Sequence, residues 1–139
     1  MNKEVIFSLK PAFAVLIESR EKDHEFRKYL PKVVPSKIWF YVTEPVSALV
    51  YIAEVGSVIA YPETVAGEGV GNTDFNAGLK VSKHAFPILH LHKLSSPLLL
   101  EELRKQFGFT PPQAFAYVDR YPTLRNFVYG KGVTLVKVF

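Results

Sequence analysis

Charged and apolar side chains alternate at the two-residue spacing of a β-strand in one short stretch, Lys22–Lys28, which we call the charged motif. Side chains two residues apart share one face of a strand. The alternation predicts one face with Asp23, Glu25 and Arg27 and an opposite face with Lys22, His24, Phe26 and Lys28. Such a strand places both signs of charge close together.

Composition limits the class of protein. The chain has 139 residues, of which 48% are hydrophobic, so we expect one core and a single domain over residues 1–139. The absence of cysteine excludes disulfides and cysteine-based zinc sites. No apolar run approaches the ~20 residues that span a bilayer, and the N-terminus does not read as a signal peptide. We therefore expect an intracellular protein, cytoplasmic or nuclear, with no membrane partner. The formal charge of +4 suits an anionic partner without requiring one.

Hydrophobic periodicity predicts the remaining elements. Strands are expected at residues 5–9, 37–43, 48–55, 85–94 and 133–138, and helices at 11–20 and 96–107. Ser96 is expected to cap the second helix, with Pro97 in its first position and Gly108 at its end. In the strand at 85–94, Leu89 and Leu91 are expected to face the core.

Residues 61–78 have a different texture, with several glycines and few large apolar side chains. Long segments of this kind inside a compact domain are often lids or binding loops. A short helix is expected to begin near Asn72, with Asn72 as its cap.

The segment Ser19–Arg27 resembles the Gly-x-Lys-x-x-Glu-x-Arg signature of ASCH domains, small β-barrels of the PUA-like superfamily that bind RNA. Lys22, Glu25 and Arg27 match the signature, whereas Arg20 stands where the family prefers glycine. Three more stretches are similar to ASCH domains in the same order along the chain. They are Phe7–Pro11, Tyr41–Pro45 and Pro111–Tyr117. The resemblance spans nearly the whole chain, and residues 61–78 are its least typical part.

The resemblance implies an α+β fold, a small mixed β-barrel of about six strands with flanking helices. It also implies a ligand cleft between the barrel and the helices. The residues expected at this cleft are Ser8, Lys10, Lys22, Glu25, Arg27 and Thr43. Lysine and arginine neutralise phosphate, while a carboxylate and a hydroxyl can read the polar edge of a base. For stacking on bases the sequence offers Trp39, Tyr41 and Tyr29.

Two classes of function follow from the resemblance. The first is a module that binds RNA or a nucleotide, and this is the function we expect. The second is a small hydrolase of the ASCH type, either an amidohydrolase acting on acylated cytidine or a ribonuclease, in which Lys22 and Glu25 would be the catalytic candidates. Glu25 stands where the amidohydrolases have a threonine, and a carboxylate cannot replace a neutral hydroxyl donor.

A structural role for the charged motif stays open, because Glu25 and Arg27 could form a buried ion pair that only joins the strand to its neighbour. His90 and His92 share one strand face and could bind zinc or copper, but the sequence supplies no clear third ligand. We therefore expect no metal and no cofactor. The sequence leaves the oligomeric state open.

Overall fold

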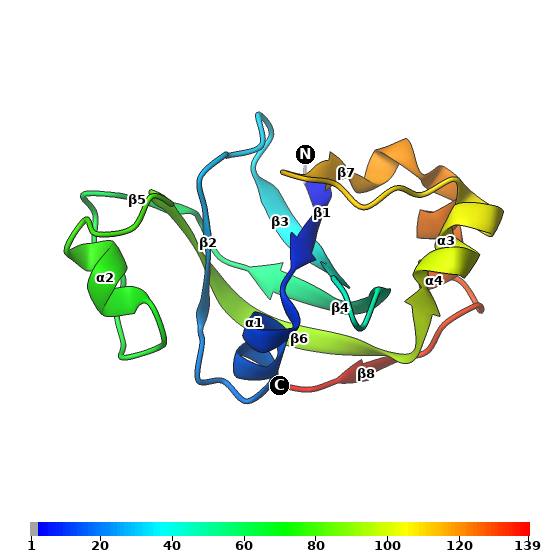
Figure 1. Cartoon of the computed structure of the whole chain (residues 1–139), viewed down its shortest axis with the longest axis horizontal. Coiled ribbons are helices and arrows are strands. Elements are labelled where there is room, and N and C mark those ends of the chain that lie inside the picture. Colours follow the sequence, from blue (N-terminus) through cyan, green and yellow to red (C-terminus); the bar gives the residue numbers. More distant parts are fainter. Residues whose placement is uncertain (1–2) are drawn as a thin grey trace.

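The computed structural model describes residues 3–139 and is built around one strongly curled mixed sheet with helices on its outside and at its mouth (Figure 1). The strands are β1 (Lys3–Leu9), β2 (His24–Arg27), β3 (Pro35–Val42), β4 (Ala48–Val55), β5 (Ile59–Ala60), β6 (His84–Leu99), β7 (Ala116–Tyr117) and β8 (Leu135–Lys137). The helices are α1 (Pro11–Glu18), α2 (Asn72–Asn76), α3 (Leu100–Phe107) and α4 (Pro122–Tyr129), with a 3-10 helix η1 (Val118–Arg120).

The strand order along the sheet is β2-β6-β4-β3-β1-β7. Among the strands of residues 3–139, only β1 and β3 pair in parallel, and β5 and β8 add to β6. The two ends of this order, β2 and β7, are not paired with each other within residues 3–139, so the sheet is a half-barrel that is open along one side. This confirms the expected α+β small barrel. The strands number eight rather than about six, because two-residue strands form at β5 and β7.

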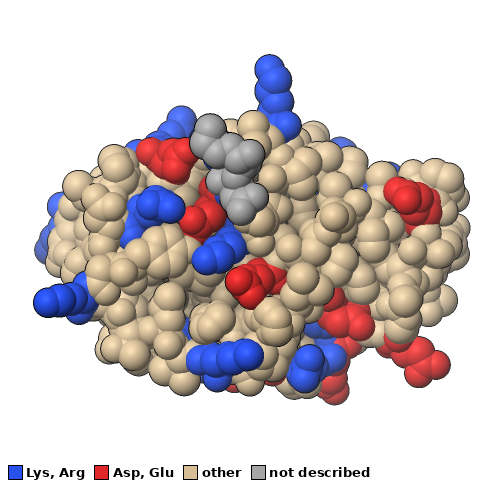
Figure 2. Space-filling model, turned by 180° about the vertical axis from the view of Figure 1, so that it is seen from behind, with Lys and Arg blue, Asp and Glu red and all other residues tan. Residues whose placement is uncertain are grey.

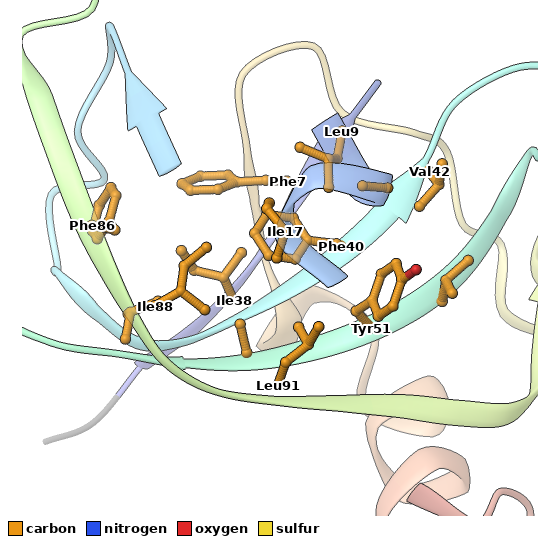
Figure 3. Close-up of a cluster of buried hydrophobic side chains, with 14 of the residues drawn as sticks. Phe7, Leu9, Ile17, Ile38, Phe40, Val42, Tyr51, Phe86, Ile88 and Leu91 are labelled. Atoms are coloured by element: carbon orange, nitrogen blue, oxygen red, sulfur yellow. The ribbon is translucent and has the colours of Figure 1, made fainter. Parts of the chain in front are cut away.

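Both faces of the central strands are buried. Inside the curl, Phe7, Ile38, Phe40 and Leu91 pack against Ile17 of α1 (Figure 3). Outside it, alternate residues of the same strands pack under α3 and α4. This outer cluster includes Ile6, Trp39, Leu103 and Leu124. The two-sided burial agrees with the continuous apolar sequence of β1 and β3.

The second main helix begins later than expected. Ser96 and Pro97 belong to β6, and α3 starts only at Leu100, without a side-chain cap. Leu98 and Leu99 pair with the first residues of β4, and this pairing outweighs the local capping signal. Gly108 does end the helix, in the left-handed conformation with φ of 64°.

Two further expectations about single residues are wrong. Leu89 is 52% exposed, because the register between β4 and β6 shifts next to it and turns its side chain outward. Asn72 is the first residue of α2 rather than its cap, since Gly71 occupies the cap position. Figure 1 places α2 at the opposite end of the molecule from α3 and α4. Within residues 3–139, no helix has the length and apolar character needed to cross a membrane.

Candidate functional site

A pocket of about 430 Å³ lies at the open side of the half-barrel. Ser8 of β1 and Lys10 line it from one side, while Glu25 and Arg27 of β2 line it from the other. Two more segments complete the wall, one around Val70–Lys80 and one at residues 113–114. The pocket therefore fills the place where β2 and β1 approach each other without pairing.

Five of the six expected cleft residues line this one pocket: Ser8, Lys10, Lys22, Glu25 and Arg27. Thr43 does not line it. Its backbone N–H donates to the Leu9 carbonyl at 2.9 Å, so Thr43 instead fixes the end of β1 behind the pocket.

Glu25 and Arg27 form the best-defined contact in the site. The Arg27 guanidinium donates from Nε at 3.1 Å and from Nη2 at 2.7 Å to Oε2 of Glu25. Nη2 also donates to the Ser8 carbonyl at 2.8 Å, which links β2 to β1 across the open side. Glu25 is only 4% exposed. The pair is therefore structural as well as part of the pocket, because removing one partner would leave a buried charge uncompensated.

Lys22 is buried, with 4% of its surface exposed, although it lines the pocket. Its Nζ lies 3.9 Å from Oε1 of Glu25 and 4.4 Å from the centre of the Phe26 ring. Burial lowers the pKa of Lys22, Glu25 opposes this shift, and the positive charge of Lys80 adds to it. Lys22 is thus a desolvated cation beside one carboxylate.

The predicted division of the charged motif into two faces is wrong at its start. The strand begins only at His24, so the side chains of Lys22 and Asp23 need not alternate between the two faces of a strand. Lys22 turns toward Glu25, whereas Asp23 turns away from the pocket and accepts hydrogen bonds from Asn72 and His24. Burial would raise the pKa of Asp23, but these hydrogen bonds outweigh it and the pKa is lowered.

The pocket carries strong positive charge. It contains five cationic side chains and one carboxylate, Glu25. The cations are Lys10, Lys22, Arg27, Lys28 and Lys80. Among them Lys28 and Lys80 were not expected at the cleft. Lys80 lies just after the glycine-rich residues 61–78, far from the charged motif in sequence, and no local pattern marks it.

The aromatic side chains of the pocket differ from those expected. Trp39 and Tyr41 are buried at 0% and 3% exposure in the outer cluster, so they cannot stack on a base. Tyr29 is 61% exposed and lines the pocket. Phe13 and Phe26 also line it, and sequence reasoning missed both.

His90 and His92 lie on β6, away from the residues that line the pocket. Over residues 3–139 no group of three or more His, Asp or Glu side chains is placed to hold a metal ion. On the face seen in Figure 2, basic side chains lie among acidic ones and do not form one broad patch.

No family model matches the chain. An ASCH domain-containing ribonuclease from Zymomonas mobilis subsp. mobilis is 26% identical over 131 residues, which cover 88% of each chain. The crystal structure of ASCH from Zymomonas mobilis matches with a TM-score of 0.67 and 24% identity, covering 96% of this chain and 98% of the other. A mutant form of that protein matches with a TM-score of 0.68 at 22% identity, covering 96% and 100%. The chain is thus similar along most of its length to an ASCH domain-containing ribonuclease, and it shares the fold of the ASCH crystal structure.

Proposed function

We propose that this chain binds single-stranded RNA, with one nucleotide in the pocket and neighbouring phosphates on its rim. The observation that carries the proposal is the presence of five cationic side chains and a single carboxylate in one pocket of about 430 Å³. Pockets of this size suit small ligands, and an excess of lysine and arginine suits a phosphate backbone.

The groups of the pocket divide by exposure. Lys10 and Lys28 are exposed at the rim and can neutralise phosphates that lie outside the pocket. Tyr29 is exposed beside them and offers a ring on which a base can stack. The carboxylate of Glu25 and the amide of Gln113 can accept or donate at the polar edge of a base.

Two likenesses support an RNA ligand. The Zymomonas mobilis relative is named a ribonuclease, and its sequence aligns along most of both chains. The resemblance to PUA-like barrels points to the same class of ligand.

The test is the salt dependence of binding. A short fluorescein-labelled single-stranded RNA is titrated with the protein at several salt concentrations, and anisotropy reports the affinity. The logarithm of the binding constant is expected to fall with the logarithm of salt by about 0.7 for each phosphate neutralised. Lys10→Gln and Lys28→Gln should each weaken binding and reduce this slope, since each removes one rim cation.

Lys105→Gln is the matched control, because Lys105 is a largely exposed lysine of α3 outside the pocket. It makes the same change in net charge and should leave both quantities unchanged. Binding that does not depend on salt, or a loss in the control as large as in the two rim variants, would refute the pocket as the binding site.

A second candidate function is RNA cleavage. It is favoured by the desolvated Lys22, whose lowered pKa suits a lysine that exchanges protons, and by the name of the relative. In this reaction the 2′-oxygen attacks the phosphorus to form a 2′,3′-cyclic phosphate. The bond to the 5′-oxygen breaks, and that oxygen takes up a proton from water and leaves as a hydroxyl group. Glu25 or neutral Lys22 would take the proton of the 2′-hydroxyl, and the cations would stabilise the negative charge that builds up on the phosphate.

Cleavage is tested with an RNA that carries a single ribonucleotide within DNA and with the matching all-DNA strand. The candidate mechanism requires cutting only beside the ribonucleotide, because the attacking group is the 2′-hydroxyl. Binding of RNA without any cleavage would leave the chain a binding module.

A further inference from the structure

Lys22 and Lys80 meet over one aromatic ring although they are far apart in the sequence. Their Nζ atoms lie 4.4 Å and 4.7 Å from the centre of the Phe26 ring. Both lysines line the pocket. The positive charge of Lys80 adds to the effect of burial in lowering the pKa of Lys22, so the two like charges act on each other.

Lys80 is held there by the segment 61–83, which we call the α2 segment. The backbone N–H of Val70 donates to the Glu21 carbonyl at 2.8 Å, and Asn72 Nδ2 donates to Asp23 Oδ1 at 3.0 Å. A side chain at Gly71 would lie 2.8 Å from the Phe26 ring and 3.0 Å from Lys80. The α2 segment therefore packs closely against the charged motif, and the position of Lys80 is part of that packing.

The Phe26 ring already has three protein groups against it. Phe75 of α2 stacks on it with ring centres 5.3 Å apart and planes 29° apart. The ammonium groups of Lys22 and Lys80 lie over the ring as well. Phe26 thus supports two cations through cation–π contacts and does not serve as a stacking platform.

The positive charge at this point is not balanced by the protein. Of the carboxylates in the described part of the chain, Glu25 alone lines the pocket. Its Oε2 accepts from Arg27, and its Oε1 is 3.9 Å from Lys22 Nζ. No carboxylate among residues 3–139 forms an ion pair with Lys80 within 4 Å. A bound anion would relieve the repulsion between the two ammonium groups.

We propose that Lys22 and Lys80 form a phosphate subsite above Phe26, so that the pocket takes a phosphate-bearing nucleotide and discriminates against neutral nucleosides. The proposal deepens the proposed function and rests on it only for the claim that the nucleotide belongs to RNA. Lys22 supplies a buried positive charge from the charged motif, and Lys80 supplies a second positive charge from the α2 segment.

The test compares adenosine with adenosine 5′-monophosphate by isothermal titration calorimetry. Charge-assisted contacts to phosphate should make the monophosphate bind at least about tenfold more tightly than adenosine. Lys80→Gln should remove most of that difference. The affinity of a short single-stranded RNA should also fall, with a salt slope lower by about 0.7.

Lys105→Gln serves again as the control with the same change of charge outside the pocket, and the melting temperature of each variant reports its folding. Equal affinities of adenosine and the monophosphate, or a folded Lys80→Gln protein that keeps the difference, would overturn the subsite even if RNA still bound. Binding of the monophosphate that depends on Lys80, without any binding of RNA, would support the subsite and overturn the proposed function.

Discussion

The backbone conformation at Arg20 accounts for the preference for glycine at this position of the ASCH signature. Arg20 follows α1 in the left-handed conformation with φ of 68°, which costs residues with a Cβ atom on the order of 1 kcal/mol. Its guanidinium lies 4.4 Å from the centre of the Phe139 ring, and this contact offsets part of the cost.

Two substitutions at Arg20 separate these effects. Arg20→Ala loses the contact with Phe139 and keeps the backbone strain, so it should lower the free energy of unfolding. Arg20→Gly loses the same contact but relieves the strain, and should therefore be about 1 kcal/mol more stable than Arg20→Ala. Urea unfolding of both variants and the wild type measures the difference. Equal stabilities of the two variants would show that the conformation at residue 20 carries no strain.

The lowered pKa of Lys22 leads us to expect opposite effects of pH on stability and on RNA binding. Its pKa is lower in the folded protein than the ordinary value near 10.5, so the unfolded chain binds more protons between the two values. The free energy of unfolding should rise with pH across this interval. Binding of RNA should weaken over the same interval, because Lys22 loses its charge.

The matched comparison for this prediction is Lys22→Met, which keeps a long side chain without the titrating group. Tyr51 and Tyr129, whose pKa values are raised mainly by burial, titrate in both proteins and cancel in the difference. Chemical unfolding of both proteins from about pH 7 to pH 10.5 measures the effect. Parallel stability curves would show that the pKa of Lys22 is not lowered.

At the residue scale, five of the six residues expected at the cleft do line the pocket, but their arrangement and most of the other lining residues were not predicted. Glu25 and Arg27 share a face because β2 covers both, as the alternation predicts. Lys22 lies before the strand, where alternation has no meaning, and its burial depends on Phe13, Phe26 and Lys80 around it. Such tertiary neighbours leave no mark in the local pattern.

At the scale of elements, the α2 segment is joined to the charged motif by a contact that tolerates only glycine. A Cβ atom at Gly69 would lie 2.3 Å from Oδ1 of Asp23, and that carboxylate is held by Asn72 and His24. Asp23 could make room only by giving up hydrogen bonds. Gly69→Ala should therefore destabilise the protein by about 1–3 kcal/mol and weaken binding of the monophosphate, because Lys80 moves with the segment.

Gly56→Ala is the control for this change. Its nearest neighbour would be a side-chain carbon of Pro87 at 3.5 Å, which is an ordinary contact, so little change is expected. Calorimetric melting and titration of both variants test the prediction. A Gly69→Ala protein with normal stability and normal affinity would mean that the α2 segment does not depend on this close approach.

The ends of helices could be predicted where a single residue such as glycine or proline sets them. They could not be predicted where pairing with a distant strand sets them. Gly108 ends α3 through its own backbone freedom, and Pro11 begins α1 as its fixed φ favours. The start of α3 depends instead on whether residues 96–99 find a partner strand. They find β4, which the capping pattern of Ser96 and Pro97 cannot reveal.

At the scale of the whole molecule, the sheet separates an inner hydrophobic cluster from an outer one. No residue of the outer cluster lines the pocket. Leu103 of α3 is fully buried in that outer cluster. Leu103→Ala should lower the free energy of unfolding by about 2–5 kcal/mol through the cavity it leaves. RNA affinity of the folded protein should stay unchanged, since no residue of α3 lines the pocket.

Leu79→Ala offers the same chemical change at a side chain that is 75% exposed, and it should cost less than about 0.5 kcal/mol. Denaturant unfolding and the RNA anisotropy titration together test both variants. A folded Leu103→Ala protein with much weaker RNA binding would show that the two sides of the sheet are coupled.

The longer strands could be predicted from their apolar patterns and the small barrel from the family resemblance, whereas the open side of the sheet could not. Each strand has its own apolar pattern, but the gap between β2 and β1 arises from how far the whole sheet curls. That gap holds the pocket, so the position of the site is a property of the complete half-barrel.

The three hydrophobic clusters differ in size, and this difference bears on amide hydrogen exchange. The α2 segment depends on a cluster of only three buried residues, Val65, Phe75 and Ala85, whereas the inner and outer clusters are much larger. Its amides should therefore exchange through local opening long before those of β3 and β4. Each such opening carries Lys80 away from Lys22, so a nucleotide could enter while the central sheet stays folded, and a bound phosphate should slow exchange in α2 more than anywhere else.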